Sequence, residues 1–103
     1  MASRISPLDN SQVAGRLRLL RFAVSGGNQT AFAAKLGIEP RRWNNFERGS
    51  PLSKEIAILL AQRIPGVSLD WLYLGKVEAL PFALQRELEL AGKATRSADA
   101  ETG

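Results

Sequence analysis

The sequence predicts an all-α fold of five short helices, with a further helix near the C-terminus. Apolar residues recur at helical spacing along most of the 103-residue chain, and no segment alternates apolar and polar residues over the length of a strand. Glycines and helix-capping residues divide the chain at short intervals. We therefore expect one helical domain at residues 11–75 and a C-terminal extension at residues 76–103.

The first helix is predicted at residues 11–25. Ser11 is suited to cap its N-terminus, and the Gly26–Gly27 pair ends it. Its apolar residues recur at helical spacing, at Val13, Leu17, Leu20 and Val24. Between them lie three basic residues, Arg16, Arg18 and Arg21. We expect these arginines to be divided between solvent and one structural ion pair.

Two short helices are predicted next, separated by a glycine. Asn28 is suited to cap the second helix, at Gln29–Leu36, and Gly37 ends it. The third helix is predicted from Pro40 to about Arg48, because the fixed φ and missing N–H of proline suit the first helical position.

The fourth and fifth helices are predicted after Ser53 and Ser68, which are both suitable caps. Residues 56–61 are apolar on all sides of the fourth helix, so we expect that helix to be central and buried. The fifth helix is short and ends at Gly75.

The helical pattern weakens after residue 75. We expect a further helix at residues 81–91 and a disordered tail after it, since residues 92–103 are small and polar. The apolar residues of this helix fall broadly on one side of a helical wheel, at Ala83, Leu84, Leu88, Leu90 and Ala91. The segment is too apolar for a free tail, and two interpretations stay open: it packs on its own domain, or on a second copy.

Composition narrows the possible functions. The chain has no histidine and no cysteine, so it lacks the commonest general base, the commonest metal ligand and any thiol chemistry. We therefore expect no enzymatic activity, no cofactor and no metal. Residues 1–75 carry ten basic and five acidic residues, and a basic body suits a polyanionic partner. No apolar run is long enough to span a bilayer, and we expect a soluble, cytoplasmic protein with no membrane association.

The most informative segment is residues 29–48. Its two short helices meet at Gly37, where a left-handed backbone is expected, and the small Ala33 allows the helices to cross closely. This is the spacing of a helix-turn-helix. On a wheel of the third helix, Trp43 and Phe46 form one face. The opposite face carries Arg41, Asn44, Asn45 and Arg48.

The residue types on this opposite face suit DNA bases, since Arg pairs bidentately with guanine and Asn with adenine. Arg42 lies at the flank of the third helix, nearer to phosphate than to bases. We therefore expect double-stranded DNA as a partner.

Residues 12–75 resemble the phage repressor and Cro family of five-helix DNA-binding domains, also called the XRE-like family. The matching residues are Gln29, Ala33, Leu36–Gly37, Phe46–Glu47, Gly49, Ser68–Leu72 and Gly75. The resemblance implies a repressor-like fold whose third helix lies in the major groove. It also implies an ion pair between Arg21 and Glu47.

The resemblance assigns roles to the site residues. Base reading is assigned to Pro40, Arg41 and Asn45, and Asn44 lies on the same face. Contacts with the DNA backbone are assigned to Asn28 and Gln29, together with Arg42 and Arg48. Pro40 departs from the family pattern, because it offers only an apolar contact, such as to a thymine methyl. Direct readout then rests mainly on Arg41 and Asn45.

Two functions are compatible with these patterns. The first is a sequence-specific transcriptional regulator, a repressor, that acts as a homodimer. Its dimer surface would lie either at the junction of the fourth and fifth helices, with Val67 and Leu69, or at residues 81–91. The second is a protein-interaction module, such as an antitoxin-like partner that binds another protein through residues 76–103.

Overall fold

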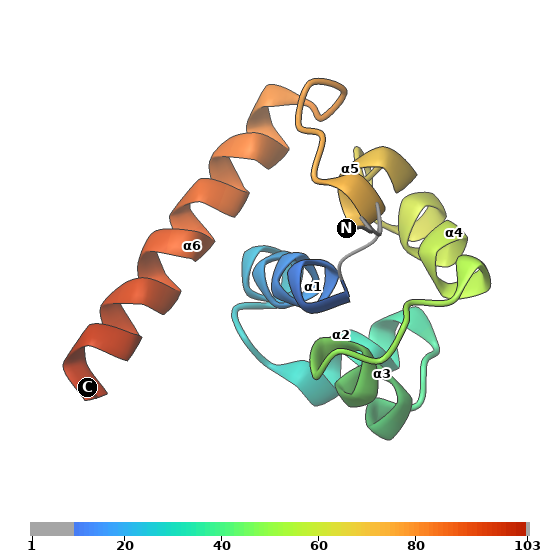
Figure 1. The fold of residues 1–103 in the computed structure, drawn as a ribbon, viewed down its shortest axis with the longest axis horizontal. Helices are drawn as coiled ribbons and strands as arrows, with labels where there is room; N and C mark the ends of the chain where they lie inside the picture. Colours follow the sequence, from blue (N-terminus) through green and yellow to red (C-terminus); the bar gives the residue numbers. More distant parts are fainter. Residues whose placement is uncertain (1–9, 103) are drawn as a thin grey trace, which may run out of the picture.

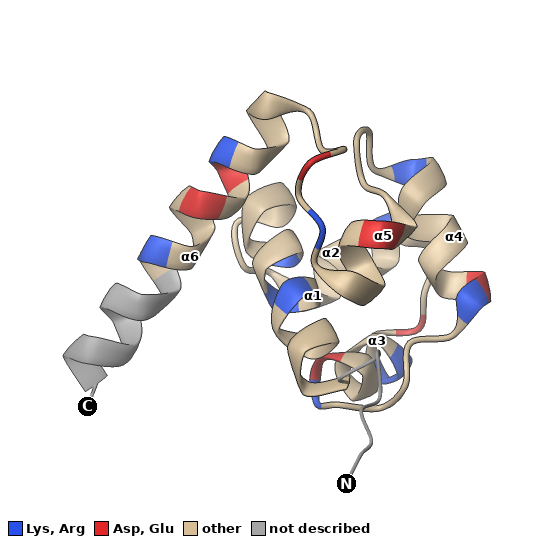
Figure 2. Ribbon diagram, turned by 45° about the horizontal axis from the view of Figure 1, so that its top comes forward, with Lys and Arg blue, Asp and Glu red and all other residues tan. Residues whose placement is uncertain are grey.

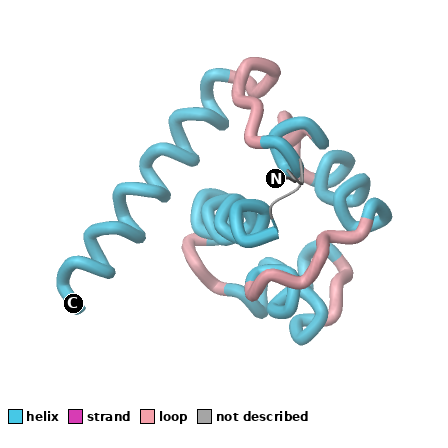
Figure 3. The backbone as a smooth tube through the Cα atoms, in the orientation of Figure 1, coloured by secondary structure: helices cyan, strands magenta, loops and turns pink. Residues whose placement is uncertain are grey.

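The computed structural model describes the backbone of residues 10–102 and the side chains of residues 10–94. This part of the chain is all-α, as predicted, and contains no strand (Figures 1 and 3). Its helices are α1 (Asn10–Ser25), α2 (Gln29–Leu36), α3 (Pro40–Glu47), α4 (Lys54–Arg63), α5 (Leu69–Leu74) and α6 (Phe82–Thr102).

The helix ends follow local capping chemistry. A side-chain oxygen accepts a hydrogen bond from the backbone N–H three residues later at each of three N-termini, those capped by Asn28, Ser53 and Ser68. Gly37 and Gly75 end α2 and α5 with φ values of 75° and 77°, in the left-handed region that a β-carbon disfavours. These boundaries are short-range properties of the sequence, and the predicted starts of α2, α4 and α5 agree with the structure. Helix α1 already begins at Asn10, so Ser11 lies inside the helix and does not cap it as predicted.

Helix α1 lies in the middle of the fold, with α2 and α3 on one side and α5 and α6 on others (Figure 1). Its Leu17 and Leu20 are completely buried in the core. The expectation that α4 is the central helix is wrong, because α4 packs at the edge, against α2 and α5. Only one of its faces is buried, and Ile58 stays 39% exposed.

The predictions for the C-terminal segment need one correction, and one open alternative is decided. Helix α6 continues to Thr102 instead of ending at residue 91 before a disordered tail. A glycine such as Gly92 inside a helix costs only about 1 kcal/mol relative to alanine, and the lysine and alanine that follow favour a helix. Of the two interpretations left open for the apolar side of this segment, the structure supports the first: Leu88 and Ala91 are buried and α6 packs on α1, so this side of α6 covers its own domain. Of the two residues offered for the alternative dimer surface, Val67 is also buried, whereas Leu69 is 39% exposed.

As expected, one of the α1 arginines forms an ion pair, Arg21 with Glu47, and Arg18 is exposed to solvent, but Arg16 has a structural role as well. The Arg16 guanidinium donates to the backbone oxygens of Leu72 and Tyr73, at 3.0 and 3.1 Å, and so binds the end of α5. Arg18 and Arg21 both contact the α2–α3 region, as described below. Because each guanidinium carries five donors, one arginine can satisfy several helix-end carbonyls.

None of the helices formed by residues 10–102 has the length and apolar character required to cross a membrane.

Candidate nucleic-acid interface

The inner face of α3 is fixed by aromatic packing. Trp43 is completely buried, and its ring centroid lies 4.9 Å from that of Phe32 on α2. Phe46 meets the edge of Trp43 at a centroid distance of 6.5 Å and is 6% exposed. Such tilted aromatic pairs are favoured over parallel sandwiches, and they set the rotation of α3 about its axis.

A buried carboxylate holds the same face to α1. Glu47 is 4% exposed, and its two oxygens accept from Nε and Nη2 of Arg21 at 2.6 and 2.8 Å. The Trp43 indole N–H also donates to Glu47. The ion pair expected between Arg21 and Glu47 is therefore present, and it is bidentate, the geometry that adds orientation to charge attraction.

Two further bonds join the region of α2 and α3 to α1. Arg21 Nη1 donates to the backbone oxygen of Gly27, at 2.6 Å, in the turn that leads to α2. Arg18 Nη1 donates to the backbone oxygen of Glu47, at 2.5 Å. The last turn of α3 is thus bonded through both backbone and side chain, so its position relative to α1 is strongly constrained.

The outer face of α3 is open to solvent. Arg41, Asn45 and Arg48 are exposed, and Pro40 is exposed at the first position of the helix. Arg41, Asn45 and Arg48 are three of the four residues that the helical wheel predicted on one face, and the fourth, Asn44, is partly buried. The structure leaves their charged and amide groups accessible, while the opposite face is locked into the core.

Helices α2 and α3 meet at the edge of this open face. Gln29 Nε2 donates to Asn44 Oδ1 at 3.2 Å, and both side chains are partly buried. This joins a residue expected at the DNA backbone to one expected at the bases. Asn28 is exposed, although its side-chain oxygen caps α2 by accepting from the Ala31 N–H at 2.9 Å.

Arg42 lies apart from this group. Its guanidinium is 5.8 Å from the centroid of the Phe46 ring, and it lines a hollow between α3 and α4 with Glu55 and Gln62. On a helical wheel, Arg42 and Asn44 point to opposite flanks of α3. The two flanks therefore carry different chemistry, with amides beside α2 and a guanidinium beside α4.

The sequence interpretation overlooked one acidic residue at this surface. Glu39 is exposed at the N-cap of α3, and its side chain makes no capping hydrogen bond. Its position directly before Pro40 was visible in the sequence, but a wheel that begins at residue 40 leaves it out. A carboxylate there repels phosphate and accepts hydrogen bonds from amino groups, such as N4 of cytosine.

Charge is unevenly distributed over the described helices. The charged residues of α1 are all basic, whereas α3, α4 and the described part of α6 carry both signs (Figure 2). Among the residues that the structure describes, no cluster of three or more His, Cys, Asp or Glu residues could hold a metal ion.

Comparison of the chain with protein-family models, with curated proteins and with solved structures finds no match. The functional interpretation therefore rests on the geometry and chemistry of the site.

Proposed function

We propose that this chain is a cytoplasmic, sequence-specific regulator of transcription that inserts α3 into the DNA major groove and acts as a repressor. One observation carries the proposal: α3 is locked on its inner face by Trp43, Phe46 and Glu47, while its outer face offers guanidinium and amide groups to solvent. A helix fixed in this way holds hydrogen-bonding groups at defined positions, as readout of base edges requires. The resemblance to the phage repressor and Cro family supplies the docking geometry.

In this proposal the two short helices have separate tasks. Arg41 reads guanine, and Asn45 reads adenine. Gln29 contacts a backbone phosphate with the second hydrogen of its amide, because the first is donated to Asn44. The Gln29–Asn44 bond then couples backbone positioning to base reading. Glu39 accepts from a cytosine amino group, the contact that its charge favours in the groove.

We propose further that the chain binds as a homodimer, because one helix-turn-helix reads too few base pairs for useful specificity. Two copies would read half-sites about 34 Å apart. The apolar side of α6 already covers α1, so the association surface falls to exposed apolar side chains at the α5–α6 link: Leu74, Val77 and Phe82, which are 45%, 47% and 77% exposed. Light scattering of Phe82→Ser tests this surface, with Leu90→Ser on α6 as the matched control.

Selection of bound sites from random double-stranded DNA tests the main proposal. We expect a defined site, bound with an affinity that falls steeply as salt rises, because binding to phosphate releases counterions. On that site, Arg41→Ala should cost about 1–3 kcal/mol and relax the preference at one base position. Gln29→Ala should weaken all sites by similar factors. Recovery of no preferred sequence, or the same preference in Arg41→Ala, would contradict the assignment.

A protein-interaction module, such as an antitoxin-like partner acting through residues 76–103, is the second candidate. The observation that favours it is the exposure of Phe82 and Leu90 on α6, since exposed apolar groups on a helix suit a protein partner. Co-purification of a second protein that is lost in Phe82→Ser/Leu90→Ser, with no site recovered from random DNA, would support this function instead.

A further inference from the structure

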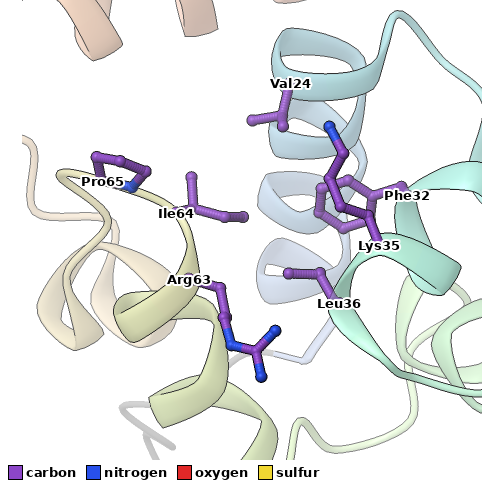
Figure 4. A pocket seen from close by; sticks show the side chains of 7 residues that line it. All are labelled: Val24, Phe32, Lys35, Leu36, Arg63, Ile64 and Pro65. Atoms are coloured by element: carbon purple, nitrogen blue, oxygen red, sulfur yellow. The ribbon is translucent and has the colours of Figure 1, made fainter.

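A hollow of about 400 Å³ lies where the end of α1, helix α2 and the end of α4 meet. Five of its lining side chains are apolar, among them Val24, Leu36 and Ile64. Figure 4 shows Leu36 and Ile64 pointing toward one another across it. Its volume lies within the range of about 300–1,000 Å³ that is usual for small-molecule sites.

Two cations complete the lining. Lys35 lies in the last turn of α2 and Arg63 in the last turn of α4, and both side chains are exposed. Neither forms a hydrogen bond or an ion pair with any residue that the structure describes, and no acid is among the described lining residues. Figure 4 shows their charged ends directed to opposite ends of the hollow.

The two features together select a ligand. Helix dipoles account for a cation at each helix C-terminus, but not for the apolar surface between the two. A neutral apolar molecule would fill the hollow and leave both cations without a partner. An inorganic anion would pair with a cation but would make no use of the apolar lining.

We propose that this hollow binds an organic acid with an apolar body, of the type of a medium-length fatty acid. The aliphatic chain lies against Val24, Leu36 and Ile64, and the carboxylate pairs with Lys35 or Arg63 at the rim. The hollow shares no lining residue with the candidate DNA interface. The proposal therefore stands independently of DNA binding and is tested on the protein alone.

The test is titration of the full chain with decanoate and with decanol, followed by calorimetry and by backbone amide shifts. We expect decanoate to bind more tightly than decanol and to shift amides around residues 24, 36 and 64. Lys35→Gln/Arg63→Gln should weaken decanoate binding about tenfold or more, because it removes the charge-assisted contact whichever of the two cations holds the carboxylate.

The matched control is Lys54→Gln/Arg86→Gln, which removes two exposed cations outside the hollow and should leave decanoate binding unchanged. All four positions are exposed, so folding is retained in both double variants. Absence of decanoate binding, equal binding of decanol, equal weakening in the control, or shifts confined to other residues would each overturn the proposal.

Discussion

Helices α3 and α6 both pack on α1, but by different kinds of contact. The eight-residue α3 is held by a bidentate ion pair, an indole hydrogen bond and aromatic edges, through Arg21, Trp43 and Glu47. The 21-residue α6 buries the aliphatic Leu88 and Ala91 on the side that packs on α1, and its Gln85 amide donates to the backbone oxygens of Val77 and Leu80 in the preceding link. A helix of two turns is not stable alone, so α3 depends on its tertiary contacts to a degree that α6 does not.

The two kinds of contact differ in how strictly they specify the orientation of a helix. Apolar contacts are non-directional, and they tolerate small rotations of a helix as long as area stays buried. Hydrogen bonds to charged groups are directional and fix both rotation and register. The polar bonds of this fold concentrate behind the face that carries Arg41 and Asn45, where the proposed function requires an exact presentation of side chains.

The largest expected loss of stability comes from removing the ion pair that anchors α3. Glu47→Ala leaves the Arg21 guanidinium and the Trp43 indole N–H without their acceptor, and loss of one partner from a buried pair costs about 3–5 kcal/mol. Denaturant unfolding measures this loss. Glu47→Gln, which keeps hydrogen-bonding capacity, should lose less.

Glu55→Ala is the matched control, because Glu55 is an exposed glutamate on α4. Its free energy of unfolding should stay within about 0.5 kcal/mol of the parent. If the free energy of unfolding falls by the same small amount in both alanine variants, α3 is not anchored by the ion pair and the contrast with α6 fails.

The next largest loss of stability is expected when the apolar contact between α6 and α1 is weakened. Leu88 is 8% exposed, so Leu88→Ala should lower the free energy of unfolding by about 2–3 kcal/mol through lost burial and the cavity left behind. Leu90, on the same helix, is 51% exposed, and Leu90→Ala should change it by less than about 0.5 kcal/mol. Equal losses in the two variants would mean that α6 does not dock on α1 through this face.

A smaller effect is expected where the α4–α5 turn meets the start of α6. Gly66 has a φ of 90°, and a β-carbon there would lie 2.8 Å from the Pro81 ring. Gly66→Ala should therefore cost about 2 kcal/mol, from the left-handed backbone and the displaced proline together.

The control for this substitution is Gly26→Ala, at a φ of 62° with nothing within 4 Å of the added carbon. This substitution should lower stability by about 1 kcal/mol, which is the cost of the left-handed backbone alone. Thermal unfolding of the two variants gives the difference, and a Gly66→Ala loss no larger than that of Gly26→Ala would show that the contact with Pro81 yields without strain.

The same contrast explains what the sequence could predict. Caps at Asn28, Ser53 and Ser68 bond to residues three positions away, so their signals are local and the helix starts follow from them. The outward face of α3 was also predictable, because aromatic and polar residues separate clearly on its wheel.

The features that the sequence did not predict depend on contacts between residues that are far apart in the chain. Arg16 bonds to backbone groups 56 and 57 residues away, and no local pattern names such a partner. The Gln29–Asn44 bond depends on how α2 and α3 cross. The apolar run of α4 predicted burial on all sides. Burial depends, however, on which other elements cover a helix, and no element fully covers Ile58.

The smallest expected effect on stability concerns a bond that joins α5 to the loop before α4. The Tyr73 hydroxyl donates to the backbone oxygen of Leu52 at 2.9 Å, and burial raises the pKa of Tyr73 above its ordinary value of 10.0 by disfavouring the charged phenolate. Both folded and unfolded chains carry the neutral phenol below pH 10, so the contribution of this group to stability is fully present there. Above pH 10 the unfolded chain loses the proton first, and stability falls until the pH passes the folded pKa.

Tyr73 is the single tyrosine of the chain, so phenolate absorbance reports this group alone. We expect a titration midpoint above 10.0 in the native protein and near 10.0 in denaturant, because unfolding returns the hydroxyl to water. Tyr73→Phe should remove the part of the alkaline loss of stability that arises from this group. A native midpoint at or below the denatured one would place the hydroxyl in solvent, and the α5 end would then be held to α1 by Arg16 without support from Leu52.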